Sequence, residues 1–567
     1  MHMNRRVSLA LLMGKQKKSV SELTTSVTTV TNTFDTYTGT WGFEQAAHLL
    51  RRTTFGPTYA QINQATSDGL NATISKLFEN QSLPADPIYY NFENDPNIAN
   101  GESWVDEPTN NQISGLNNAR KRSLEAWSFK IIRESGMNIR EKMLLFWHNH
   151  FVVSNTNDAR FQHKYINLLR ENALGNFREL VELITVDPSM LKYLNGTQNS
   201  KNAPNENYSR ELLELFTIGK GDAAGPGDYT NYTEDDVVQI ARALTGWKHF
   251  DADDLTQVQS DFRPNRHDTG DKQLSNRFND IIITDAGEDE YKTVIDIIFQ
   301  QDEVARFISR KLYRWFVHFD INSEVETNII EPMAQMLIAD SYDVQPTIKA
   351  LLSSEHFYDL SIRGCMITHP IDYLFKMVNT FELELNPDIL QEYNILRRLF
   401  RAIAPLEMVM YSHPNVAGWK AYYQTPQYYK IWINAVTLPV RMNFSDTLSE
   451  GYNVSGFQVK LNVLAFTASL DNPADPDDLI NEISFRDFGL AEKKSSLKPF
   501  LEFKEDENYQ VPVSLIEELT KLKFQDAIDR HENIKPTILK LEEVQIRSFE
   551  ENLINQESTF EVSGLLV

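Results

Sequence analysis

Apolar residues recur at intervals of three and four along most of this chain, which is the spacing of one face of an α-helix. The pattern begins at Trp41 and pauses at the turn that contains Gly56 and Pro57. A helix over Tyr59–Phe78 is expected next. Further helices are predicted over Asn117–Glu134, Ile139–Phe151, Asp158–Asn172, Asn176–Val186, Arg210–Ile218, Thr233–Trp247, Glu290–Phe299, Asp302–Phe319, Glu324–Asp340 and Asp343–Ser353.

Strict alternation of apolar and polar residues, the pattern of a half-buried strand, is scarce. Asp280–Thr284 is the clearest short strand, and no repeat of roughly 30–45 residues indicates a solenoid. The predicted fold class is therefore all-α: a large multi-helical single domain with long loop insertions and a mixed, mainly helical C-terminal appendage.

Changes in composition divide the chain into three predicted parts. Residues 1–40 form an N-terminal arm, because residues 19–40 are rich in Ser and Thr and lack helical periodicity. Residues 41–446 form the helical domain, which we expect to end near Asn443–Asp446. Residues 447–567 form the appendage, in which helical patterns return over residues 512–555.

The amino-acid composition argues against several classes of binding partner and of structural feature. The formal net charge of −24 argues against general nucleic-acid binding and against docking on anionic membranes. Cys365 is the single cysteine, so neither an intramolecular disulfide nor a thiolate metal cluster can form. No apolar run reaches the ~18 residues of a transmembrane helix.

The N-terminus has some features of an export signal. Asn4–Arg6 is basic and precedes the apolar run Val7–Met13, as in a secretory or twin-arginine signal. The run is short, lysines follow it, and no small-x-small cleavage site is present. These residues leave both an exported and a cytoplasmic location open.

Five segments of the chain carry a family resemblance: His48–Pro57, Arg140–Ser154, Asn205–Trp247, Arg266–Gly270, and Pro414–Trp419 with Trp432–Asn434, together with Arg306–Tyr313. In this order they resemble the bacterial family DUF1800, a domain of unknown function. The resemblance covers roughly residues 41–446 and predicts the helical domain, but it supplies no reaction. It implies export to the cell envelope and a working partner of the sulfatase-like (DUF1501-type) kind.

The segment Phe146–Phe151 contains two histidines that are candidate metal ligands. His148 and His150 diverge by about 200° on a helix of 3.6 residues per turn, so both reach one ion only if the helix ends between or just after them. In the alternative interpretation, both are partly buried and satisfied by carbonyls or carboxylates.

Asn205–Glu211 begins a helix with a cluster of charges. Glu206 and Arg210 are four residues apart, and Glu211 follows. Glu206, Glu211 and Arg210 are candidate catalytic residues beside a metal. The alternative is a polar network that orders the helix end.

The loop after Arg266 supplies His267 as a candidate metal ligand, and Asp268 as a candidate catalytic residue or as the hydrogen-bond partner of that ligand. A simple turn is the alternative. Imidazole and carboxylate ligands would suit a divalent ion such as Zn, Mn or Fe.

Two further groups are candidates for binding a substrate. Arg51 and Arg52 suit a carboxylate, sulfate or phosphate group, unless they pair with acidic residues of the chain. Trp419 and Tyr422 belong to an aromatic segment of the kind that lines carbohydrate or peptide clefts, or that pins a loop to the core.

Two functions follow from these residues. The first is a metal-assisted enzyme acting on an envelope or extracellular polymer. The second is a non-enzymatic helical scaffold or binding protein that works with a partner in the cell envelope. The patterns HExxH, GxSxG, the Walker loop and GxGxxG after a strand are all missing from the chain, which argues against the enzyme classes that they mark.

Overall fold

A computed structural model describes residues 32–90, 95, 98–110, 112–154, 158–250, 256–363, 365–419, 432–462 and 466. The chain divides into two units, residues 1–31 and residues 32–567, and we describe the second unit by itself. The predicted export signal, Tyr422 and most of the predicted appendage lie outside the described residues.

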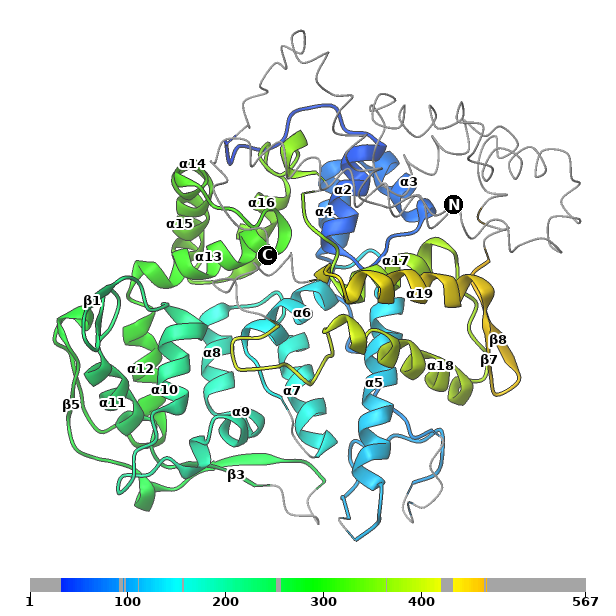
Figure 1. Cartoon of the computed structure of the whole chain (residues 1–567). Coiled ribbons are helices and arrows are strands. Elements are labelled where there is room, and N and C mark those ends of the chain that lie inside the picture. The colour runs from blue at the N-terminus through cyan, green and yellow to red at the C-terminus, as the bar shows by residue number, and fades with distance from the viewer. Residues whose placement is uncertain are drawn as a thin grey trace, which may run out of the picture. The chain divides into compact units, whose positions relative to one another are not determined.

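Helices dominate the described part of the chain, and the predicted all-α class is confirmed (Figure 1). Most predicted helices are present with ends shifted by one to several residues. The longer helices are α2 (Phe43–Thr53), α3 (Tyr59–Asp68), α4 (Leu70–Leu77), α5 (Leu116–Glu134), α6 (Arg140–His150), α7 (Ala159–Glu171), α8 (Phe177–Thr185), α9 (Pro188–Tyr193), α11 (Glu234–Ala243), α12 (Glu290–Ile298), α13 (Asp302–Phe316), α15 (Glu331–Ala339), α16 (Val344–Leu352), α17 (Pro370–Thr380), α18 (Ile389–Ala402) and α19 (Thr437–Glu450).

Strands occur only as short antiparallel pairs within the described residues. The predicted strand Asp280–Thr284 is seen as Ile282–Ile283. The pairs are β1 (Ala223–Gly225) with β2 (Asp228–Tyr229), β3 (Trp247–Phe250) with β4 (Gln259–Phe262), β5 (Lys272–Gln273) with β6 (Ile282–Ile283), and β7 (Tyr452–Val454) with β8 (Phe457–Val459). Among the helices of the described part, none is both long enough and apolar enough to cross a bilayer.

Two glycines explain where the predicted helices differ from the observed ones. The helix expected over Tyr59–Phe78 is split into α3 and α4 at Gly69, whose φ of +81° is left-handed. Helix α11 ends before the expected Trp247, because Gly246 has a φ of +105° and Trp247 begins β3. Side-chain periodicity continues through both points, so the pattern alone did not reveal the breaks.

Helix starts follow local capping chemistry. Thr58 and Thr233 form capping boxes with Gln61 and Asp236, each satisfying backbone N–H groups at a helix start. The helices that the periodicity missed also begin with such signals. Asp187 before Pro188, His369 before Pro370, and Asp388 cap α9, α17 and α18 through their side chains.

Segments distant in sequence share one core. Helix α18 lies along α5 (Figure 1), and α13 packs on α15. The turn after α2 contacts α17, where Asn379 Nδ2 donates to the carbonyl of Phe55. Helix α19 runs across the boundary expected at residue 446, and the division between domain and appendage stays a prediction.

We predict that Gly56→Ala destabilises the protein more than Gly287→Ala. Both glycines have a φ of +60°, so a new Cβ costs about 1–2 kcal/mol of backbone strain at either position. At Gly56, however, that Cβ would lie 2.4 Å from the backbone oxygen of Phe375, whereas nothing lies within 4 Å at Gly287. The midpoint of thermal unfolding should be lower for Gly56→Ala by at least about 2 °C. Equal midpoints would contradict the close packing of this turn against α17.

Candidate functional site

One group of side chains has the geometry of a metal site. Among the described residues, His267, Asp285 and Glu290 each offer a ligand atom, and these atoms lie within 4.8 Å of one another. His267 follows a 3-10 turn (Pro264–Arg266), Asp285 follows β6, and Glu290 is the first residue of α12. The group is therefore assembled from separate loops, and the β5–β6 pairing lies between them in sequence.

The hydrogen bonds of His267 fix which ring nitrogen faces the carboxylates. Its Nδ1 lies 2.9 Å from the carbonyl oxygen of Thr245, and because a carbonyl only accepts, Nδ1 carries the hydrogen. Its Nε2 lies 3.0 Å from Glu290 Oε2 and 3.5 Å from Asp285 Oδ1. Two carboxylates facing one ring nitrogen require a cation there, either a second proton on the ring or a metal ion.

Burial differs across this group. The side chains of His267 and Glu290 are 2% and 0% exposed, whereas Asp285 is 46% exposed. Burial disfavours the imidazolium, but the Glu290 hydrogen bond and the Thr245 carbonyl outweigh it and raise the pKa of His267. The group is buried on one side and open to solvent on the side of Asp285.

Lys272 balances part of the negative charge. Its Nζ lies 2.5 Å from Glu290 Oε1, and both side chains are fully buried. Nζ also donates to the backbone oxygen of Asp268 at 2.5 Å. Glu290 therefore presents one oxygen to Lys272 and the other to His267.

Asp268 faces an arginine, not the metal group. Arg242 donates from Nε and Nη2 to its carboxylate at 2.8 and 3.3 Å, and the Gly270 amide donates to Oδ1. Burial opposes ionisation of Asp268, but these hydrogen bonds outweigh it and lower its pKa. These contacts make Asp268 an anchor of the loop beside His267, and its predicted catalytic role stays a prediction.

The hydrogen bond of His148 leaves neither ring nitrogen free for a metal ion while the ring is neutral. Its Nε2 accepts the backbone N–H of Tyr411 at 3.1 Å, so in the neutral ring Nδ1 carries the hydrogen and no lone pair remains. The side chain is buried, and burial lowers its pKa to about 3, which keeps it neutral. His148 packs edge-on against His413, with ring centroids 4.5 Å apart.

His150 is also saturated. Its Nε2 donates to the carbonyl of Phe216 at 2.9 Å, and its Nδ1 accepts from Lys311 Nζ at 3.0 Å. Lys311 donates to the carbonyl of Leu215 as well, at 2.8 Å. Neither His148 nor His150 belongs to the metal group that the described residues form. Their bonds fit the buried hydrogen-bond interpretation, and their roles as metal ligands stay predictions.

Lys311 and His150 cap a π-helical segment. This segment, Leu212–Thr217, continues the short helix α10 (Asn207–Glu211), and its carbonyls at Leu215 and Phe216 accept the bonds just described. Burial, together with the charge of Arg314, lowers the pKa of Lys311 to about 7. A neutral amine has two hydrogens, which match its two acceptors.

The charges at the start of α10 form an ion-pair network on the protein surface. Arg210 contacts Glu206 at 3.0 Å and Glu234 at 2.7 Å. Glu211 is half-buried; burial, then the Glu214 carboxylate, raises its pKa to about 7. None of Glu206, Arg210 and Glu211 belongs to the metal group that the described residues form, and their predicted catalytic roles stay predictions.

The predicted substrate residues are dispersed. Arg52 Nη2 donates to the backbone oxygen of Ile362 and contacts Cys365 Sγ, so part of its guanidinium is already used; Arg51 lies beside it in the last turn of α2. Trp419 is 1% exposed, and its backbone N–H donates to Asn149, which fits the loop-pinning interpretation.

Sequence reasoning found His267 but missed Asp285, Glu290 and Lys272. The sequence signal for the two acidic residues as metal ligands was weak, because isolated acidic residues between a strand and a helix usually act as helix caps. Only the β5–β6 pairing, in which Lys272 lies opposite Ile283, shows that these residues lie close to the loop that contains His267.

Comparison with known proteins identifies the family. Residues 48–527 match the family model described as "Protein of unknown function (DUF1800)", and the chain belongs to this family. The match extends beyond the segments whose sequences resemble the family. No curated protein and no solved structure matches the chain.

We predict that the stability of the protein rises with pH between about 7 and 10.5, and that Lys311→Met removes this rise. The folded pKa of Lys311 is about 7 and its ordinary value is 10.5, so between them the unfolded chain holds more protons. The contribution to the unfolding free energy is at most about 1.4 kcal/mol per pH unit. Denaturant unfolding at several pH values measures it, with Lys349→Met as the control. Identical slopes in wild type and Lys311→Met would refute the assignment.

Glu211→Gln should stabilise the protein at pH 8 and not at pH 4. The folded pKa of Glu211 is about 7 against an ordinary 4.5, so its ionisation destabilises the folded state as pH rises through this window. We expect a gain of about 1 kcal/mol at pH 8, discounted for partial solvation and measured by denaturant unfolding. Glu206→Gln is the control, because Glu206 is ion-paired with Arg210 and its loss brings no such gain. A Glu211→Gln variant that is less stable than wild type at pH 8 would contradict the raised pKa of Glu211.

Proposed function

We propose that this member of the DUF1800 family is a metal-assisted enzyme, and that His267, Asp285 and Glu290 hold its divalent ion. The observation that supports this best is the orientation of His267, whose Nδ1–H bond to Thr245 directs Nε2 at two carboxylate oxygens. A ring nitrogen held by a backbone carbonyl in this way is the usual arrangement of a metal-ligating histidine.

The donor set suits the proposed ion. One imidazole and two carboxylates match Zn, Mn or Fe, as the sequence suggested. An ion held by three protein ligands keeps positions open for water or substrate and supplies Lewis-acid chemistry. Lys272 contacts Glu290 Oε1, and Oε2 accepts the Ala286 amide at 3.2 Å. A carboxylate oxygen can accept more than once, so Oε2 can still bind the ion.

The substrate class that we propose is an envelope or extracellular polymer. Asp285 is 46% exposed, so an ion bound to it would be reached from the surface, as a long polymer requires. The export and the sulfatase-like (DUF1501-type) partner implied by the family resemblance point to the same class of substrate.

A non-enzymatic scaffold is the second candidate. It is supported by the burial of His148 and His150 in hydrogen-bonded contacts, since the histidines of the family-like segment then serve stability. Under this proposal, a protonated His267 with Lys272 balances Glu290 and Asp285 without an ion.

Measuring the metal content of the full chain by elemental analysis distinguishes the metal-assisted enzyme from the scaffold. After dialysis against Zn, Mn or Fe and removal of free ion, we expect about one equivalent in wild type. Asp285→Asn should weaken binding at least about tenfold, while Asp261→Asn, a similarly exposed carboxylate on β4, should not. Less than about a tenth of an equivalent in wild type with every ion would support the scaffold instead.

Activity is measured on the same proteins. The ion-loaded chain should shorten soluble envelope polysaccharides, as followed by size-exclusion chromatography, and both a chelator and Asp285→Asn should abolish this. Stoichiometric metal without any change in a panel of polymers would keep the metal site and refute the substrate class.

A further inference from the structure

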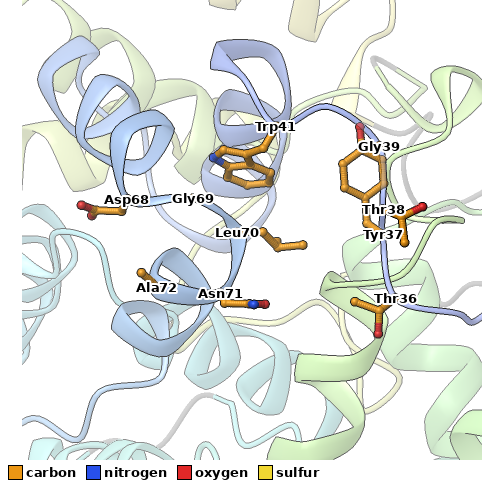
Figure 2. A pocket seen from close by; sticks show the side chains of 10 residues that line it. All are labelled: Thr36, Tyr37, Thr38, Gly39, Trp41, Asp68, Gly69, Leu70, Asn71 and Ala72. Carbon is orange, nitrogen blue, oxygen red and sulfur yellow. The ribbon is translucent and has the colours of Figure 1, made fainter.

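A groove opens between the extended segment 36–41 and the junction of α3 with α4 (Figure 2). Its volume is about 460 Å³. One wall is residues 36–41, and the other is residues 68–72, where Gly69 breaks the helix. These elements differ from those that carry the metal group, so the groove is a separate feature of the molecule.

The wall formed by residues 36–41 is fixed to the core. Tyr37 N donates to the backbone oxygen of Ser353 at 2.7 Å, and Thr38 donates from its amide and its hydroxyl to Glu355. Trp41 Nε1 donates to the carbonyl of Ala65 at 3.1 Å, which ties the segment to α3. The groove is therefore preformed, as ligand sites usually are.

The lining combines apolar rings with unused polar groups. Figure 2 shows the Trp41 indole, the Leu70 side chain and the Tyr37 ring along the groove, with Asn71 and Thr36 toward one end. Within the described part of the chain, the Asn71 amide and the Thr36 hydroxyl have no hydrogen-bond partner, and both residues are exposed. They are free to bond a ligand that lies across the rings.

The charges of the lining residues argue against anionic ligands. No lysine or arginine lines the groove, so it offers nothing to a phosphate, sulfate or uronate group. The charged lining residue is Asp68, which points away from Tyr37 in Figure 2 and accepts a bond from Gln64. The groove therefore favours an uncharged ligand.

An extended peptide fits less well. A peptide that adds to a strand needs a run of free backbone groups. Here the amides of Tyr37 and Thr38 are already bonded to Ser353 and Glu355. Too little backbone remains for such pairing.

A sugar ring matches the lining better. Pyranose rings present an apolar face that packs on aromatic side chains and hydroxyls that bond amides and hydroxyls. The volume corresponds to roughly one or two such rings, near the lower range of ligand sites. We propose that this groove binds a neutral glycan chain, one or two pyranose units at a time, through Trp41, Tyr37, Leu70, Asn71 and Thr36.

Titration calorimetry on the full chain tests this, with cellohexaose and maltohexaose as neutral probes and a guluronate hexamer as the charged one. Wild type should bind at least one neutral probe and bind the guluronate at least about tenfold more weakly. The double variant Thr36→Ala/Asn71→Ala should lose about five- to twentyfold in affinity for the neutral probe.

The double variant changes two exposed side chains and spares the packed rings, so we expect its thermal unfolding midpoint to match that of wild type. Asn63→Ala, an exposed asparagine on α3 outside the groove, is the matched control and should bind as wild type does. A chelator should leave glycan binding unchanged, which separates this site from the metal group. Absence of binding to both neutral probes at millimolar concentration would overturn the proposal. Unchanged affinity of the double variant for the neutral probe would overturn it as well. So would tighter binding of the guluronate hexamer, or of a hexathreonine peptide, than of the neutral probes.

Discussion

The capping of the π-helical segment Leu212–Thr217 by His150 and Lys311 is the contact on which the arrangement of the central helices depends. A π-helical turn displaces its last carbonyls from the usual ladder, and two buried carbonyls without donors would cost about 1–3 kcal/mol each. His150 comes from the end of α6 and Lys311 from α13, so satisfying Phe216 and Leu215 holds three distant parts of the chain together. The same requirement fixes the end of α6, and with it the position of His148 against Tyr411.

Among the described residues, two kinds of charged cluster can be compared. In one, every partner is internal. Arg170 contacts Glu141 at 2.8 Å with both side chains almost fully buried, and Arg242 grips Asp268 from two nitrogens. Such pairs hold loops and helices in place but offer nothing to a ligand. In the other, buried groups lead to a solvent-exposed carboxylate: His267 and Glu290 are enclosed, whereas Asp285 is nearly half exposed. That opening is the physical reason to propose the metal there and not at the histidines of α6.

The proposed metal group and the proposed glycan groove would complement each other on one chain. The metal group is formed by loops around β5, β6 and α12, and the groove is formed by residues 36–41 with α3 and α4. A protein that acts on a long polymer gains affinity from a second contact along it, because the second binding event becomes intramolecular. Each site has its own chemistry, an ion at one and aromatic rings at the other.

The sequence by itself determined the helical class, most helix positions and the family, because helical periodicity and capping are local properties of neighbouring residues. It also singled out His267 as a candidate, and it placed His148 and His150 correctly at the end of a helix. It did not distinguish a ligand from a buried hydrogen-bonded histidine, because that depends on which carbonyl or amide each nitrogen meets. Phe216, Tyr411 and Thr245 are those hydrogen-bond partners, and each lies more than 20 residues from its histidine. Asp285 and Glu290 became candidates only in the structure, where the β5–β6 pairing brings them close to His267. Tertiary packing sets such contacts, and no local sequence pattern predicts them.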